Sequence, residues 1–259
     1  MIKITQIYMS IVLISSLLYA EDSETSSLKP NYTFSNININ YFDWSQQSQK
    51  DSAKGDFSYL GYEGGAGWNS ATIYGFLNIE NPTYSYREES PKDLRFTSLV
   101  DLDINLKKGL KIHMHNFSLH SESYYVNDFV LGMAYKIDTN FGLWFRPYIG
   151  IHHTYDTYYS GINGYMGGWV FNYDFNMFDY KFSLSQWNEI EFDRDENFYL
   201  NDEGESIGDG KSWGINGALS LWMHFTKSFT VGTQYRYAKN KLGYTNYQSG
   251  MIYTLKYNF

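Results

Sequence analysis

Aromatic and hydrogen-bonding side chains alternate along two neighbouring stretches of this 259-residue chain. Tyr59 and Glu63 are four positions apart in the first stretch, and Tyr74, Phe76 and Asn78 follow at every second position in the next. Residues two or four apart on a β-strand share one face. Aromatic faces stack on flat rings, and carboxylates and amides exchange hydrogen bonds with hydroxyl groups. These residues therefore predict reversible binding of a flat, polar, uncharged ring solute.

Histidines offer a second kind of chemistry. His113 and His115 are two residues apart, with His120 close behind, so the first two could chelate a metal from one face of a strand. A tolerated polar face is the simpler interpretation of the same spacing. We expect no metal site and no cofactor.

The elements that must position these residues are strands. Period-two alternation predicts twelve of them, at 33–44, 56–65, 68–79, 93–105, 110–120, 125–137, 141–154, 163–175, 178–192, 211–225, 228–238 and 246–259. The chain holds 26 Tyr, 18 Phe and 7 Trp, and aromatic residues favour strands. The fifth run alternates poorly around 113–120, and a β-bulge there is one explanation.

The last ten residues alternate up to the final position. One row is apolar and rich in aromatic residues, and it consists of Met251, Tyr253, Leu255, Tyr257 and Phe259. In a soluble protein such a strand would expose an apolar edge. In an outer-membrane barrel the row faces lipid, and its aromatic residues lie at the membrane interface. We therefore predict an all-β transmembrane barrel of about twelve antiparallel strands, with Tyr257 and Phe259 as the terminus that the barrel-assembly machinery reads.

The N-terminus predicts export. Residues 1–20 have one basic residue, Lys3, then a short apolar run and the small residue Ala20, which is the pattern of a cleaved signal peptide. Residues 21–32 are predicted to be a polar leader and 33–259 the barrel. No later segment approaches ~18 consecutive apolar residues, so any membrane insertion would be as a barrel.

Charge and composition exclude several classes of protein. The formal net charge is −8, which argues against nucleic-acid binding because phosphate contacts need a basic surface. The absence of cysteine excludes disulfides, thiolate metal sites and a lipidated cysteine after the signal peptide. The mean hydropathy of −0.45 fits strands with one lipid-facing and one wet face.

The predicted connections alternate between short and long. Tight turns are expected at 64–67, 106–109, 138–140, 176–177 and 226–227, and longer polar loops at 45–55, 80–92, 155–162, 193–210 and 239–245. Only the link near Glu122 departs from this rule. Short periplasmic turns and long extracellular loops are the arrangement of outer-membrane barrels, and an even strand number places both termini on the periplasmic side.

Two motifs resemble the Tsx-type nucleoside-specific channel family. YLGYE at 59–63 and TIYGF at 72–76 are similar to the family's Tyr-Leu-Glu-x-Glu strand and its Asp-x-Tyr-Gly-aromatic strand at the same spacing. LGM at 131–133 and IDT at 137–139 add a second match. The resemblance implies a twelve-stranded Gram-negative outer-membrane channel for passive transport of nucleosides. The sequence departs from the family at Gly61 and Thr72, where acids are usual, and at 99–101 and 233–235.

The period-two alternation divides each strand into a lipid-facing row and a lumen-facing row. The row that carries the charged residues is assigned to the lumen, because Arg or Lys on the lipid face would cost ~2–4 kcal/mol at the midplane. The predicted solute-binding residues are Tyr59, Glu63, Tyr74, Phe76, Asn78, Arg95, Asp101, Arg146, Tyr148 and Arg236. Twelve strands leave a narrow lumen shaped by its side chains. The alternative interpretation of these groups is that they fill and brace the barrel.

Other functions stay open as alternatives. The barrel could carry other small solutes or ions, or it could be a non-transporting receptor or adhesin that acts through its loops. Outer-membrane phospholipases also use twelve strands, but Ser220 and His224 fall on the lumen row rather than on the outer face, so we expect no catalytic residues.

The acidic stretch 193–209 carries seven acids and only one basic residue, Arg194. It could repel anionic solutes at the mouth or bind divalent cations beside lipopolysaccharide, and a solvated loop is the simplest interpretation. Expected partners are nucleosides, outer-membrane lipid, lipopolysaccharide and the assembly machinery, with phage binding to the outer loops a further possibility.

Overall fold

The computed structural model describes residues 29–52, 54–86, 93–201 and 203–259. The predicted signal peptide, 1–20, lies outside the described residues, as does most of the predicted leader, 21–32. Among the described residues, no helix is long and apolar enough to cross a membrane.

Thirteen strands and two short helices make up the described chain. The strands are β1 (Tyr32–Trp44), β2 (Phe57–Gly67), β3 (Ala71–Glu80), β4 (Arg95–Asn105), β5 (Leu110–His120), β6 (Tyr125–Tyr135), β7 (Ile137–Asp138), β8 (Leu143–Asp156), β9 (Ser160–Met177), β10 (Tyr180–Phe192), β11 (Trp213–His224), β12 (Phe229–Lys239) and β13 (Gln248–Asn258). The helices are α2 (Gln46–Ser52) and α3 (Glu196–Tyr199).

These strands form one closed antiparallel barrel. Each strand pairs with its sequence neighbour, and β1 pairs with β13 from Asn36–Asn258 to Trp44–Gly250. The two-residue strand β7 continues β6 past Lys136, and both pair with β8. The predicted twelve-stranded barrel is therefore confirmed, with β6 and β7 as one interrupted strand.

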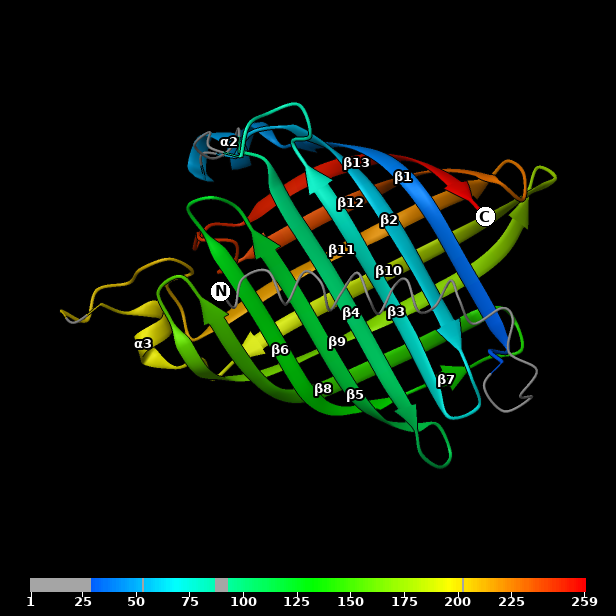
Figure 1. Cartoon of the computed structure of the whole chain (residues 1–259), viewed down its shortest axis with the longest axis horizontal. Helices are drawn as coiled ribbons and strands as arrows, with labels where there is room; N and C mark the ends of the chain where they lie inside the picture. The colour runs from blue at the N-terminus through cyan, green and yellow to red at the C-terminus, as the bar shows by residue number, and fades with distance from the viewer. Residues whose placement is uncertain (1–28, 53, 87–92, 202) are drawn as a thin grey trace.

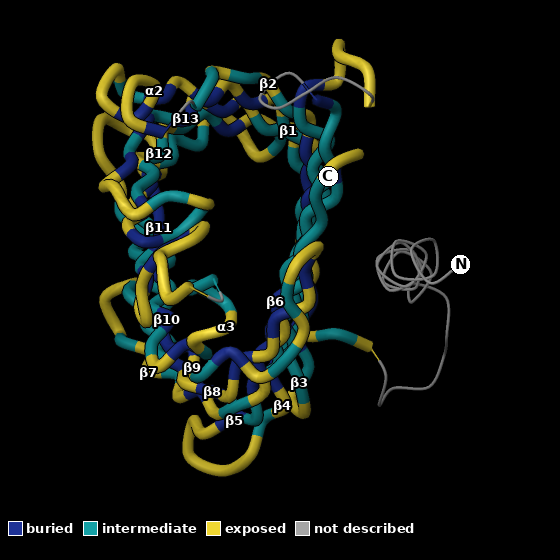
Figure 2. Tube along the Cα trace, turned by 90° about the vertical axis from the view of Figure 1, so that its left-hand side faces the viewer, coloured by how far each residue is buried: buried dark blue, intermediate teal, exposed yellow. Residues whose placement is uncertain are grey.

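The barrel has two unlike ends (Figure 1). The connections that carry α2 and α3 lie at one end, which we call the loop end, and the C-terminus lies at the other, which we call the turn end. Seen along its length, the ring of strands is elongated rather than round (Figure 2).

Side chains alternate between an exposed outer face and a buried inner face. Ile39 on β1 is 60% exposed and the next residue, Asn40, is 3% exposed. Leu221 on β11 is 45% exposed and its neighbour Ser220 is 3% exposed. The exposed rows are apolar, so they form the lipid-facing surface that such strands require.

Two local predictions are wrong. Residues 64–67 are not a turn, because β2 continues to Gly67 and pairs with the start of β1 from Tyr32. The predicted loop at 155–162 shortens to three residues between β8 and β9. The long connection predicted at 45–55 is present between β1 and β2, and it contains the short helix α2.

The poor alternation of the fifth run has a cause other than a bulge. β5 pairs with β4 and β6 without any register shift, and the shift that does occur is between Ile151 and His153 of β8. The outward row of β5 changes character halfway along the strand, and it reads Leu110, Ile112, Met114, Asn116, Ser118 and His120. Polar residues on the outer face, rather than an extra residue, break the pattern.

Candidate functional site in the barrel lumen

The carboxylate of Glu63 is the best-fixed acceptor on the lumen wall of β2. It accepts hydrogen bonds from the Tyr74 hydroxyl at 3.0 Å, from the Lys256 ammonium at 2.8 Å and from the Asn36 amide at 3.3 Å. These donors come from β3 and β1, which flank β2, and from β13, which lies on the other side of β1. Three donors on different strands hold the carboxylate in one orientation, which preorganises its remaining lone pairs.

A ladder of asparagine amides runs along β1 beside Glu63. Asn38 donates to Asn36 at 2.9 Å, and Asn40 donates to Asn38 at 2.6 Å. Gly61 faces this ladder from β2, and a Cβ atom at that position would collide with the amide oxygens of Asn38 and Asn78. The glycine at this position, where the resembling family has an acid, therefore makes room for amide groups.

Phe76 presents a lumen ring that makes no ring contact with any described residue. It is the strand neighbour of Glu63 in the β2–β3 register. Tyr74 differs, because its hydroxyl is bound to Glu63 and its ring stacks on Phe34 at 6.3 Å between centroids. Phe76 is thus free to stack on a solute, whereas Tyr74 braces the carboxylate.

Two tryptophans on β10 and β11 carry cations over their faces. The Lys256 ammonium lies 3.9 Å from the Trp222 ring centre, and the Arg236 guanidinium lies 4.4 Å from that of Trp187. Arg236 also donates to the Gly217 carbonyl at 2.9 Å and makes no ion pair among the described residues. These contacts add aromatic and cationic surface to the wall opposite β2 and β3.

The β4, β5 and β8 wall is braced by ion pairs. Arg146 spans Asp103 at 2.7 Å and Asp101 at 2.9 Å, although β8 and β4 are not neighbours in the sheet. His113 and His115 each bond one of these aspartates through Nδ1 at 2.8 Å. A planar guanidinium that engages two carboxylates is a rigid connection across the lumen.

The lumen is filled on one side. His113, Val130 and His152, which point inward from β5, β6 and β8, are all 0% exposed. The side chains of Glu63 and Lys256, on β2 and β13, are 21% and 15% exposed. The accessible part of the lumen therefore lies beside the Glu63 carboxylate and its neighbours.

Loops interlock over the lumen at the loop end. Lys241, between β12 and β13, pairs with Glu191 of β10 and lies 3.5 Å from Asp128 of β6. Arg194 pairs with Glu191 at 2.6 Å and with Asp209 at 3.4 Å. These contacts join strands on different sides of the barrel to two outer connections.

Lys54 lies in the connection between β1 and β2 and contacts the connection between β12 and β13. Its ammonium donates to the Leu242 carbonyl at 2.9 Å and lies 4.9 Å from the Tyr244 ring centre. Burial, together with the nearby charge of Arg95, lowers the pKa of Lys54 to about 8. Burial raises the pKa of Asp209, which accepts the Gly243 amide at 2.7 Å.

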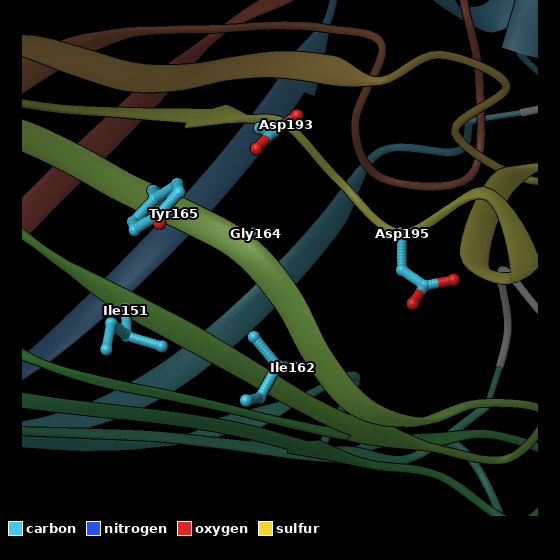
Figure 3. A pocket seen from close by; sticks show the side chains of 6 residues that line it. All are labelled: Ile151, Ile162, Gly164, Tyr165, Asp193 and Asp195. Carbon is cyan, nitrogen blue, oxygen red and sulfur yellow. The ribbon is translucent and has the colours of Figure 1, made fainter.

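The acidic stretch after β10 divides into two parts. Asp209 faces the ion pairs described above, whereas Asp193 and Asp195 flank a shallow pocket of about 350 Å³ on the barrel wall (Figure 3). The other pocket-lining residues are Ile151, Ile162, Gly164 and Tyr165. Binding of divalent cations by this stretch stays a prediction.

Two clusters consist of residue types that can bind metal ions, and a basic side chain already contacts each cluster. Asp101, His113 and His115 place possible ligand atoms within 4.8 Å of one another, as do Asp128, His152 and Glu191. Arg146 binds the aspartate of the first cluster, and Lys241 lies between the two acids of the second. These positive charges oppose a metal cation at either place.

Among the described residues, Ser220 and His224 do not contact each other. Ser220 faces Gln234 at 3.3 Å, whereas His224 contacts Ser183 at 2.9 Å on the lumen face. Asp174 accepts a hydrogen bond from Ser183 and does not orient the imidazole. A Gly-x-Ser-x-Gly match at 210–214 runs into the first two residues of strand β11 instead of forming a strand-to-helix turn.

The ten predicted lumen residues separate into three groups. Tyr59, Glu63, Tyr74, Phe76 and Asn78 lie together on β2 and β3, with Arg95 nearby and bound to Glu80 at 3.0 Å. A second group, Asp101, Arg146 and Tyr148, belongs to the braced wall. Arg236 lies apart on β12 over Trp187.

Sequence reasoning did not single out the asparagine ladder, Trp187 or Trp222. The signal was present, because Asn36, Asn38 and Asn40 alternate with exposed apolar residues on β1. The same parity places Trp222 on the inward row with Ser220. Period-two reading of every strand, rather than of the motif strands alone, would have found these residues.

A closed twelve-stranded antiparallel barrel, apolar outside and polar inside, defines an integral outer-membrane protein of the porin-like channel class. Residues 39–259 match the family described as nucleoside-specific channel-forming protein, Tsx. The chain belongs to this family and is a bacterial outer-membrane channel for passive diffusion of nucleosides.

One solved structure supports the fold, and two others are reported for comparison only. The NanC porin superposes with a TM-score of 0.52 over 85% of this chain and 98% of that chain, at 12% identity. A bacterial polysaccharide outer membrane secretin gives 0.44 over 89% and 99%, at 7% identity. The outer membrane channel DcaP of Acinetobacter baumannii gives 0.39 over 88% and 96%, at 8% identity. Identities this low concern the fold alone.

Proposed function

We propose that nucleosides cross the barrel along the β1–β3 wall, with the base stacked on Phe76 and the ribose hydroxyls bonded to Glu63. The observation that carries this proposal is the pairing of a free aromatic ring with a carboxylate that three donors hold in place. A fixed acceptor and a fixed ring need no reorganisation when the solute arrives, so less of the binding free energy is lost to ordering.

The asparagine ladder extends this wall along the direction of transport. Asn36, Asn38 and Asn40 supply amide groups at every second residue of β1. Successive polar groups let hydroxyls and ring nitrogens exchange partners as the solute advances. Several weak contacts suit a channel better than one tight pocket, because the solute must also leave.

The interlocked loop end supports selection by charge. Lys241 and Arg194 neutralise part of the acidic charge there, because they face Glu191, Asp128 and Asp209. The connection 193–209 carries seven acids against Arg194 alone, so the mouth keeps an excess of negative charge that repels anionic solutes. We infer that uncharged ring solutes pass more readily than nucleotides.

The remaining roles are also proposals. The channel works without cofactor, energy source or enzymatic activity. Its lipid face contacts lipopolysaccharide, its terminus at Tyr257 and Phe259 engages the assembly machinery, and its outer loops are exposed to phage. A plugged receptor or adhesin barrel is the rival from another class, and a channel for other small solutes is the rival within the class.

Single-channel current block tests the proposal. The purified protein is placed in planar bilayers, and nucleosides, nucleotides, sugars and amino acids are added in turn. We expect conductance and a concentration-dependent block by nucleosides at lower concentrations than by sugars or amino acids. Absence of conductance would favour the plugged receptor, and equal block by sugars and nucleosides would contradict the proposed wall.

A further inference from the structure

The connection between β12 and β13 begins with a tight turn, 240–244, which folds into the mouth of the barrel. A backbone pairing between Lys241 and Tyr244 closes this turn. The side chain of Leu242 packs against a cluster that includes Phe42 and Trp44, which lie on the inward row of β1. The turn therefore lies inside the ring of strands, and we call residues 240–244 the Lys241 turn.

The connections that contain α2 and α3 hold the Lys241 turn in this position. The Arg194 guanidinium donates to the Asn240 carbonyl at 2.9 Å, and the Lys54 ammonium donates to the Leu242 carbonyl at 2.9 Å. The φ angles of Asn240, Leu242 and Gly243 are 49°, 62° and 82°. Left-handed backbone is unfavourable for leucine, so this conformation persists because the surrounding contacts fix it.

The side chain of Lys241 reaches across the mouth. Its ammonium pairs with the carboxylate of Glu191 on β10 and lies 3.5 Å from that of Asp128 on β6. We call these three residues the Lys241 bridge, and none of their side chains is more than 13% exposed. On one side of the closed ring, β8, β9, β10 and β11 separate β6 from β12, and on the other side β5, β4, β3, β2, β1 and β13 do so. The Lys241 bridge therefore divides the mouth into two parts.

The part of the mouth between the Lys241 bridge and β8–β11 is filled with side chains. His152 and Thr154 bond the Asp128 carboxylate at 2.9 and 2.8 Å, and Asn163 donates to Thr154 at 3.2 Å. His152, Thr154 and Asn163 are at most 1% exposed. Seen from the loop end, α3 lies in front of this side of the ring (Figure 2). A solute that enters from the loop end must therefore pass on the other side of the bridge, which is the side of Glu63.

We propose that the Lys241 turn and the Lys241 bridge form the constriction of this channel, and that Lys241 sets the largest solute that enters from the loop end. Opposite charges that water does not screen attract strongly, so the bridge fixes one edge of the opening. Nucleosides pass this point, because the family is a nucleoside-specific channel, and larger solutes are stopped there. The limit acts on any solute, so it follows from the channel function and not from the proposed stacking on Phe76.

Polyethylene glycols of graded mass test the constriction in the wild type. The purified protein is placed in planar bilayers, and each glycol is added to one side of a single channel and then to the other. A glycol that enters the lumen lowers the conductance. The largest glycol that enters should be smaller from one side than from the other, because the constriction lies near one end of the barrel. Equal limits from both sides would overturn the proposal.

Truncation of Lys241 then identifies the constriction. Lys241→Ala should raise the lower of the two glycol limits toward the higher one and increase the conductance, whereas Lys241→Arg keeps a cation between the two acids and should preserve both values. Because Lys241→Ala leaves two buried carboxylates unpaired, Lys241→Ala/Asp128→Asn/Glu191→Gln is measured in parallel and should give the same shift.

A lysine at the turn end supplies the matched control. Lys181 pairs with Asp174 at 2.9 Å, and Lys181→Ala should leave the lower glycol limit unchanged. Heat-modifiable migration shows which variants are folded. An unchanged lower limit in a folded Lys241→Ala or triple variant, or the same shift in Lys181→Ala, would show that the Lys241 bridge is not the constriction. Nucleoside block that persists while the glycol limit shifts would leave the proposed stacking site intact.

Discussion

Phe76→Ala is the sharpest test of the proposed nucleoside wall. The ring makes no stacking contact with any described ring, so its removal deletes solute stacking without breaking an internal aromatic pair. Stacking of one base on an aromatic side chain contributes ~1–3 kcal/mol. With a tenfold change for each ~1.4 kcal/mol, the nucleoside concentration that gives half block should rise roughly 5- to 150-fold.

The assay is nucleoside block of single-channel current, with glucose as a solute that has no aromatic ring. Leu77→Ala, on the outward row of the same strand, is the matched control and should leave block unchanged. Tyr74→Phe keeps a ring but loses the hydrogen bond to Glu63, so its effect on block should be smaller than that of Phe76→Ala. A folded Phe76→Ala channel with unchanged nucleoside block would refute the reasoning, because the ring would then only brace the wall.

Three further predictions concern assembly, the mouth and pH. Ile73→Asp should reduce the heat-modifiable folded form, because it places a charge on the lipid face, whereas normal folding would show that the face is misassigned. Lys241→Met leaves Glu191 and Asp128 without their shared ammonium and should lower the free energy of unfolding by up to roughly 3–5 kcal/mol, measured in urea; an unchanged midpoint would contradict this. Because the pKa of Lys54 is lowered to about 8, the mouth loses positive charge as the pH rises from about 7 to 9. Cation preference, read from reversal potentials, should increase over that range in the wild type but not in Lys54→Met.

Strand number and facing could be predicted from the sequence because a barrel repeats one simple rule along its whole length. Each strand must present apolar groups to lipid at every second residue, so the pattern is enforced even where turns vary. The prediction was wrong at 64–67, where glycines suggested a turn. Pairing with the start of β1 outweighs that local preference and extends β2 to Gly67.

The site could be predicted only in part. Parity places Glu63, Phe76 and Asn78 on the lumen face, but it does not say which groups meet across the barrel. Arg146 and Asp101 are 45 positions apart in the sequence, and the ion pair between them joins two strands that are not neighbours in the sheet. Contacts of this kind depend on the curvature and width of the closed ring, which no single strand encodes.

The interlocked loop end has a consequence for how this surface can diversify. Three outer connections contact one another at this end. Lys54 contacts Leu242, 188 positions away in the sequence, and Asn246 contacts Asp51, 195 positions away. Asp209 contacts Gly243, 34 positions away. Outer loops that stand alone accept insertions and substitutions independently. Here a substitution in one loop removes contacts that hold the other two loops in place. Natural variants under selection by antibodies should therefore differ in all three loops together rather than in one loop alone.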